Sequence, residues 1–335
     1  MALRPNPFKD YVFIDYATQV YSALVLLLVL LFHNLTVPHW GWIVLAHAVG
    51  IATVHWLVKR GAAENPPKSI DFFRHFYPVL FYIWFFAETG LMNRMFFKEY
   101  MDPVVIRWEQ SLFGCQPSIL WMEKLPYLAV SELFYAAYFS YYLMIGGVGI
   151  ALYLRNRQQF FHYVSVISFV FYVCYTVYII LPVIGPPVFF QQVFGFSLPA
   201  DLQELAAHVG YPEAVQSGAF FKLMGWIYRV FDSPGAAIPS SHVAIAICTA
   251  FFSFLYLPRI RYVHLVAAIL LCGSTVYCRY HYLTDVLAGI VTAGVLVPLG
   301  HWLYLRFEQS PGIGSPNAKQ ASSVSDPPPG VSPIL

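Results

Sequence analysis

Charged residues are scarce in this sequence: Asp, Glu, Lys and Arg make up 11% of its 335 residues, against about 25% in a typical soluble protein. Hydrophobic residues make up 59%. A soluble domain could not bury that much apolar surface, so the composition excludes the soluble class. It predicts an integral membrane protein folded as one all-α helical bundle. The net charge of +2 says little about partners, and no nucleic-acid partner is expected.

Cysteine is also scarce, and the five cysteines lack the C-x-x-C spacing that is typical of metal clusters. Three of them fall within apolar runs, where a buried cysteine acts as a small apolar side chain. No metal and no other cofactor is therefore expected. A disulfide between Cys115 and Cys278 stays open, because both are expected on the same side of the membrane.

Long apolar runs divide the chain into predicted membrane spans. About 20 residues at a rise of 1.5 Å cross the hydrocarbon core of a bilayer. The sequence contains eight such runs, which predicts a polytopic bundle of about eight transmembrane helices. They lie near residues 17–36, 40–58, 75–93, 129–153, 161–183, 241–257, 262–279 and 285–305.

Basic residues in the short loops predict how the bundle is oriented. Arg155 and Arg157 follow the fourth run, and Arg259 and Arg261 follow the sixth. Loops rich in Lys and Arg face the cytoplasm, and an even number of spans puts both termini on that side. The longer segments 94–128 and 184–240 then lie outside. Residues 101–128 are expected to form either a helix along the membrane surface or an ordinary packed loop, and another amphipathic helix is expected around 213–231. The short loops favour a bacterial inner membrane.

Two polar motifs interrupt the apolar C-terminal third, and both are predicted at the outer face. The first is Pro239-Ser240-Ser241-His242, and the second runs from Arg279 to Asp285 with His281 between them. If residues 281–285 form one helical turn, His281 and Asp285 share a face, so that the carboxylate accepts the imidazole N–H and selects the tautomer. The other ring nitrogen of His281 is then free to react.

Two histidines on one face, one of them oriented by a carboxylate, are the groups that phosphoryl transfer through a phosphohistidine requires. One histidine attacks phosphorus, and the other protonates the leaving oxygen. Arginine, hydroxyl groups and backbone N–H groups bind the remaining phosphate oxygens, and Ser240, Ser241 and Arg279 are the candidates beside the histidines. A single histidine near the end of a span is more often an interfacial residue, and it is the combination that favours catalysis.

The first motif resembles the P-S-x-H motif of the type 2 phosphatidic acid phosphatase superfamily, and His281-x-x-x-Asp285 resembles its H-x-x-x-D motif. Residues 108–118, 137–142 and 182–186 are similar to the branch that contains inositol phosphorylceramide synthases. The resemblance covers roughly residues 70–305 and implies a six-helix phosphatase-like core. It implies that His281 is the nucleophile, that Asp285 orients it and that His242 is the general acid.

The chain departs from the phosphatase pattern in its arginines. Lys222 and Arg229 have the spacing of the family's K-x6-R-P motif, but Val230 stands where proline is expected. Arg279 lies two residues before His281, whereas the phosphatases place their arginine farther upstream, and this shift is similar to the synthase-like branch. Lys222 and Arg229 are therefore added to the predicted phosphate-binding residues.

The sequence thus predicts a membrane lipid phosphatase or phosphotransferase that acts on a lipid phosphate or phospholipid, with water or an alcohol as acceptor. The alternative is a non-enzymatic transporter or scaffold, and the oligomeric state is left open. Three segments are expected: a two-span extension (1–69), the catalytic membrane domain (70–308) and a disordered cytoplasmic tail (309–335). Within the spans, Glu88 and Glu132 either bind an acceptor hydroxyl or serve as structural hydrogen-bond partners.

Overall fold

The computed structural model describes residues 8, 10–186, 199–206, 210–231 and 235–309. Within these residues the chain forms thirteen helices, which confirms the all-α class. Most of the tail predicted to be disordered lies outside the described residues. The helices are α1 Phe13–Phe32, α2 Trp40–Gly61, α3 Lys68–Met92, α4 Asp102–Phe113, α5 Pro117–Lys124, α6 Leu128–Arg155, α7 Arg157–Ile180, α8 Ala200–Ala206, α9 Glu213–Gln216, α10 Ala219–Phe231, α11 Ser241–Tyr256, α12 Arg261–Tyr277 and α13 Leu283–Gln309.

Five of the described helices, α1, α2, α6, α7 and α13, are long and apolar enough to cross a membrane. Helices α11 and α12 are apolar but shorter. The span predicted near residues 75–93 corresponds to α3, which belongs to neither group, because residues such as His75, Tyr77 and Glu88 lower its mean hydropathy. The prediction of a polytopic membrane protein is confirmed, and the number of apolar helices is smaller than the eight expected spans.

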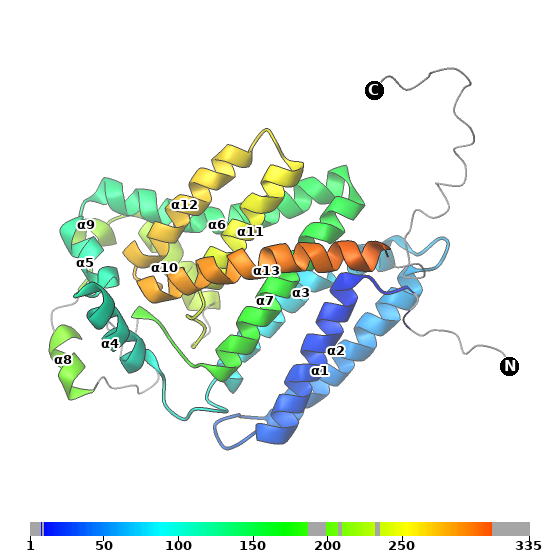
Figure 1. The fold of residues 1–335 in the computed structure, drawn as a ribbon, viewed down its shortest axis with the longest axis horizontal. Helices are drawn as coiled ribbons and strands as arrows, with labels where there is room; N and C mark the ends of the chain where they lie inside the picture. The colour runs from blue at the N-terminus through cyan, green and yellow to red at the C-terminus, as the bar shows by residue number, and fades with distance from the viewer. Residues whose placement is uncertain (1–7, 9, 187–198, 207–209, 232–234, 310–335) are drawn as a thin grey trace, which may run out of the picture.

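Helix α7 lies at the centre of the bundle and packs against α1, α3, α6, α11 and α13 (Figure 1). The chain turns sharply into it at Asn156, whose side-chain oxygen accepts the backbone N–H groups of Gln158 and Gln159 at 2.9 and 3.1 Å. Such a cap satisfies donors that the first turn of a helix leaves free. Most of α7 is buried, as its nearly continuous apolar and aromatic sequence requires.

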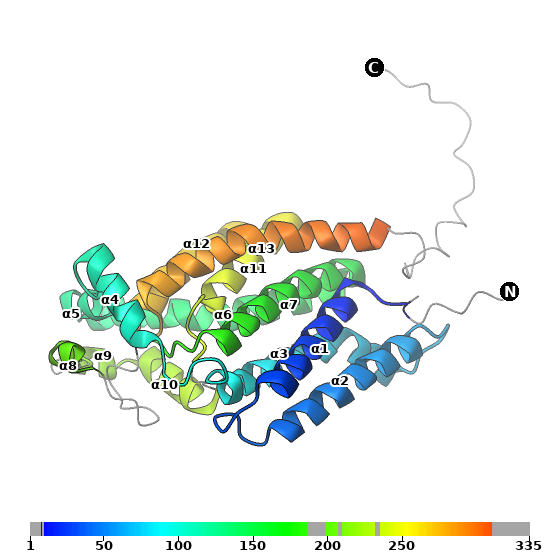
Figure 2. The same ribbon diagram turned by 60° about the horizontal axis from the view of Figure 1, so that its bottom comes forward.

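Short helices gather at one end of the bundle, away from α1 and α2 (Figures 1 and 2). Helices α4 and α5 fall within segment 101–128, where the helical alternative is confirmed, and α9 and α10 fall within 213–231, where the expected helix is confirmed. Their position along a membrane surface remains a prediction. The N-terminus of α13, which carries the second histidine motif, lies at this same end (Figure 1).

Candidate active site

The segment from Arg279 to Asp285 turns the chain from α12 into α13. Arg279 has a φ of 63°, in the left-handed region that is uncommon for residues other than glycine. Helix α13 begins at Leu283, two residues after His281, so the single helical turn expected over 281–285 is not what forms. Instead the carboxylate of Asp285 accepts the backbone N–H of Tyr282 at 2.9 Å, which folds the turn back onto the start of the helix.

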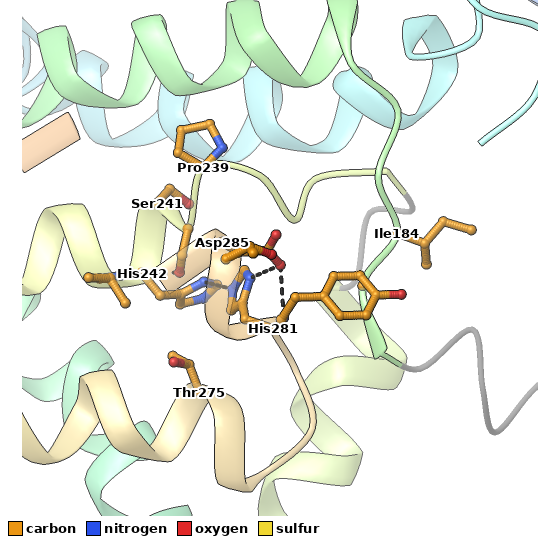
Figure 3. A network of polar contacts seen from close by, with 12 residues as sticks. Ile184, Pro239, Ser241, His242, Thr275, His281 and Asp285 are labelled. Atoms are coloured by element: carbon orange, nitrogen blue, oxygen red, sulfur yellow. Dashed lines mark hydrogen bonds and ion pairs between the residues drawn. The ribbon is translucent and has the colours of Figure 1, made fainter. Parts of the chain in front are cut away.

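This turn places the imidazole of His281 between Asp285 and His242 (Figure 3). Its Nδ1 lies 3.4 Å from Oδ2 of Asp285, and its Nε2 lies 3.5 Å from Nδ1 of His242. A proton on Nδ1 of His281 is donated to the carboxylate and leaves Nε2 unprotonated, so that the N–H at Nδ1 of His242 donates to it. The structure therefore brings together the three residues predicted to be catalytic.

His281 is buried, and burial lowers the pKa of its imidazole to about 4, while a hydrogen bond to the backbone of Ala237 opposes the shift. Taking a cation out of water is unfavourable, so the neutral ring is the stable form at neutral pH. A neutral imidazole with an unprotonated Nε2 is the form that can attack an electrophile.

His242 lies in the first turn of α11, which Ser240 begins. The Ser240 side chain accepts the backbone N–H of Val243 at 3.4 Å, and its own N–H donates to the carbonyl oxygen of Asp285 at 3.0 Å. The hydroxyl of Tyr178 donates to the carbonyl oxygen of Pro239 at 2.8 Å and accepts the N–H of Ser241 at 3.1 Å. These bonds fix the start of α11 against α7 and α13, and thereby the position of His242.

Tyrosine rings surround His242 on the side away from Asp285. The rings of Tyr138 and Tyr141 lie 5.2 and 4.7 Å from the imidazole, measured between centroids. Tyr138 shares a 2.6 Å hydrogen bond with Tyr228, whose ring stacks on Tyr280 at 4.0 Å. Helix α6, helix α10 and the turn between α12 and α13 thus supply an aromatic wall of four tyrosines beside the proposed general acid.

The predicted phosphate-binding residues differ in how far they are buried. The guanidinium of Arg279 is fully buried and donates to the carbonyl oxygens of Gly210 and Ile119 at 3.0 and 3.4 Å. Lys222 and Arg229 are exposed on α10. Arg279 thus ties the turn to the short helices. A phosphate-binding role for these three residues, and for Ser240 and Ser241, remains a prediction.

Two carboxyl groups on α4 hold the same turn, and the motifs did not identify them. Asp102 accepts the backbone N–H groups of Ile184 and Gly185, each at 2.8 Å, and the hydroxyl of Tyr282 at 3.0 Å. Glu109 accepts the N–H of Thr284 at 3.0 Å, in the first turn of α13. Burial raises the pKa of both carboxyl groups to about 7. Glu109 belongs to a segment whose sequence is similar to the synthase branch. That similarity could not reveal its contact with Thr284, because the two residues are 175 positions apart in the chain.

Within the described residues, three or more His, Cys, Asp or Glu side chains do not come together in a group that could hold a metal ion. All five cysteines are free thiols, so the disulfide left open between Cys115 and Cys278 does not form here.

Comparison with known proteins agrees with the geometry. Residues 104–299 match the family model of the PAP2 superfamily, a range that includes both histidine motifs and runs from the first turn of α4 into α13. Neither the comparison with curated proteins nor the comparison with solved structures gave a match. Because the matched range is more than half of the chain, this membrane protein belongs to the PAP2 superfamily.

Proposed function

We propose that the protein is a metal-independent phosphatase or phosphotransferase that acts on a lipid phosphoester through a phosphohistidine at His281. One observation carries this proposal: the His281 imidazole lies within 3.5 Å of both the Asp285 carboxylate and the His242 ring. The three residues have the geometry of a nucleophile, its orienting carboxylate and a general acid. Membership of the PAP2 superfamily agrees with this assignment.

In the first step, Nε2 of His281 attacks phosphorus, and a P–N bond forms as the ester P–O bond breaks. Burial favours the neutral form of His242, so this residue gains a proton as the anionic substrate enters and then gives it to the leaving oxygen, which departs as an alcohol. Asp285 accepts the Nδ1–H of His281 and so stabilises the positive charge that develops on the ring. The substrate phosphate must lie between the two histidines, so the 3.5 Å gap between their nitrogens has to widen on binding.

In the second step, His242 takes a proton from the acceptor, whose oxygen attacks phosphorus and breaks the P–N bond. Water as acceptor releases phosphate, and a lipid alcohol as acceptor yields a new phospholipid. Both acceptors use the same residues. We include transfer of a phosphorylated headgroup, as in inositol phosphorylceramide synthases, because the position of Arg279 is similar to that branch.

The proposal includes a location for the reaction. The Lys and Arg residues of the short loops favour a site on the extracytoplasmic side of a bacterial inner membrane. Attaching a reporter enzyme to the C-terminus tests this orientation, because the proposed topology puts that terminus in the cytoplasm.

The test of the mechanism uses two leaving groups and three variants of the purified protein. His281→Ala should abolish turnover of every phosphoester and prevent radiolabelled phosphate from being trapped on the protein. His242→Ala should slow formation of the phosphohistidine from an alkyl ester by about 100-fold or more but from an aryl ester much less, because an acidic leaving group needs no proton. His264→Ala, at the far end of α12 beside Ser253, is the control and should leave both rates unchanged.

Turnover that survives in His281→Ala would show that the protein is not a phosphohistidine enzyme. The acceptor is then identified with a labelled phospholipid donor, incubated with and without ceramide or diacylglycerol. Product that depends on the added alcohol, with negligible free phosphate, identifies a transferase. Release of free phosphate regardless of the alcohol identifies a phosphatase.

A further inference from the structure

A shallow, largely open cavity of about 290 Å³ lies between α2 and α3, outside the residues that match the family. Its walls are mostly aromatic and aliphatic, with one carboxyl group among them. Because α2 is a candidate membrane span, the cavity belongs to the part of the molecule that faces lipid. The lining residues are Trp42, Ile43, Ala46, Trp84, Ala87, Glu88 and Leu91.

The carboxyl group in this cavity belongs to a buried pair. Glu88 is 5% exposed, and its Oε1 lies 2.7 Å from Nε2 of His47, which is fully buried. The His47 ring stacks on Phe85, with 5.4 Å between centroids and 9° between planes. An ionisable pair among apolar helices is costly, and such residues are commonly retained where they contact a ligand or line a path.

This polar cluster has hydrogen-bonding capacity that the described residues do not use. Nδ1 of His47 is buried and has no hydrogen-bond partner among them, and neither has the hydroxyl of Tyr21, whose ring lies 6.5 Å from the His47 ring. Buried polar atoms are normally satisfied, and each exception calls for an explanation. A pair kept only to join two helices would not require a cavity beside its carboxyl group.

The charge of the lining determines which lipid fits. None of the lining residues is Lys or Arg, and the Glu88 carboxyl group would repel a phosphate. A carboxyl oxygen with lone pairs to spare accepts the hydrogen bond of an alcohol, and the indole rings of Trp42 and Trp84 suit the carbon atoms next to it. We infer that the cavity between α2 and α3 binds the hydroxyl end of an uncharged membrane lipid alcohol, with Glu88, held by His47, as the acceptor of its hydrogen bond.

The experiment uses the full chain, purified and placed in phosphatidylcholine nanodiscs, with a photoreactive diacylglycerol as probe. Labelled peptides should come from α2 and α3, and unlabelled diacylglycerol should compete for the labelling. A photoreactive phosphatidic acid with the same chains should label these peptides about tenfold less, because its phosphate lies where the carboxyl group repels it.

Two variants change the cavity in different ways. Ala87→Leu fills it without altering the Glu88–His47 pair, and Glu88→Gln keeps its shape while weakening the hydrogen-bond acceptor. Each should reduce diacylglycerol labelling by about tenfold. Asp10→Asn is the control, since it removes a carboxylate before α1 that binds the half-buried Lys59 of α2, and labelling should not change.

Equal labelling by the two lipids, labelling mapped to other helices, or labelling unaffected by both variants would each overturn the inference. Size-exclusion chromatography shows whether Ala87→Leu folds. If it does not, the inference is tested by the labelled peptides and the competition experiment in the unmodified protein. The assay reads labelling and not turnover, and it is repeated with His281→Ala so that hydrolysis of the phosphatidic acid probe to diacylglycerol cannot contribute. Its failure would therefore leave the phosphohistidine mechanism untouched, and its success would not depend on that mechanism.

Discussion

At the scale of single residues, the proposed reaction depends on a His281 ring that is neutral and held in one orientation. Burial lowers the pKa of its imidazole to about 4 from an ordinary 6.5, and its contacts with Asp285 and His242 favour a single tautomer. The ring therefore needs no deprotonation at neutral pH before it attacks. Burial that is costly for the charged form is useful to the proposed nucleophile, because it keeps the ring in its reactive form at neutral pH.

The lowered pKa of His281 predicts two pH effects. Protonation blocks Nε2 only near pH 4, so the loss of kcat/KM on this group should appear at that pH and not near 6.5. Between those two values the unfolded chain binds more protons at His281 than the folded protein does, so the contribution of this residue to stability rises with pH. The measurement is the Tm of the protein minus that of His281→Asn across pH 4 to 7, and a difference independent of pH would contradict the assignment.

At the scale of elements, α4 supports the reactive turn although it supplies no reacting group. Glu109 binds the start of α13, and Asp102 joins the loop after α7 to Tyr282. The mixed composition of residues 101–128 suited a surface helix and an ordinary packed loop equally, and the structure shows helices α4 and α5 there. The contacts could not be predicted, because each carboxyl group reaches a partner that the fold alone brings close.

Removing the Glu109 carboxyl group tests this support. Glu109→Ala leaves the N–H of Thr284 without its acceptor, which should cost about 1 kcal/mol and lower kcat by displacing Asp285. Glu109→Gln keeps an acceptor and should retain most activity. Burial raises the pKa of Glu109 from 4.5 to about 7, so its contribution to stability is lost as pH rises through that interval. The Tm of the unmodified protein should therefore fall relative to that of Glu109→Gln between pH 5 and 8.

The crossing of α11 and α13 is a second test at this scale. A Cβ on Gly289 would meet the carbonyl oxygen of Ser240 at 2.6 Å and Cβ of Val243 at 3.1 Å, so Gly289→Ala must push the two helices apart. The distance between His242 and His281 should grow, and kcat should fall by about tenfold or more. Gly294→Ala on the same helix meets nothing within 4 Å and should keep full activity with equal or slightly higher Tm. Equal rates in the two variants would show that this close approach is unimportant.

At the scale of the whole molecule, the N-terminal helices are joined to the rest by buried polar contacts. Asp15 on α1 binds Arg74 at 2.6 Å and the hydroxyl of Tyr77 at 2.7 Å, both on α3. Thr18 shares a 3.1 Å hydrogen bond with Tyr172 of α7. The predicted extension over residues 1–69 therefore packs on the central helix, and the boundary at residue 70 remains a prediction.

A chain that begins at residue 70 should consequently be unstable. It leaves Arg74 buried without its carboxylate, a loss of about 3–5 kcal/mol when one partner of a buried pair is removed. The Tm and the monodisperse yield should both fall sharply. Asp15→Ala should reproduce much of the loss in the full chain, whereas Asp10→Ala, which breaks the more exposed pair with Lys59, should cost at most about 1 kcal/mol.

The membrane class and the two histidine motifs could be predicted because they rest on composition and on short spacings. The direction of the Arg279 side chain could not be predicted in this way. Its place beside His281 in the sequence suggested a contact with phosphate, but its left-handed backbone turns the guanidinium toward Gly210 and Ile119. Side-chain direction depends on backbone conformation and on partners far away in the chain, and motif spacing contains neither.

The position of Asp285 in the last helix has a consequence for biosynthesis. His242 leaves the ribosome before His281, and the carboxylate that orients the nucleophile comes later still, at the start of α13. Helices are made from the N-terminus onward, so the nascent chain carries its histidines without an aligned pair until the final span is inserted. On the proposed mechanism, the arrangement of His242, His281 and Asp285 therefore forms only after α13 has been made and has packed against α11.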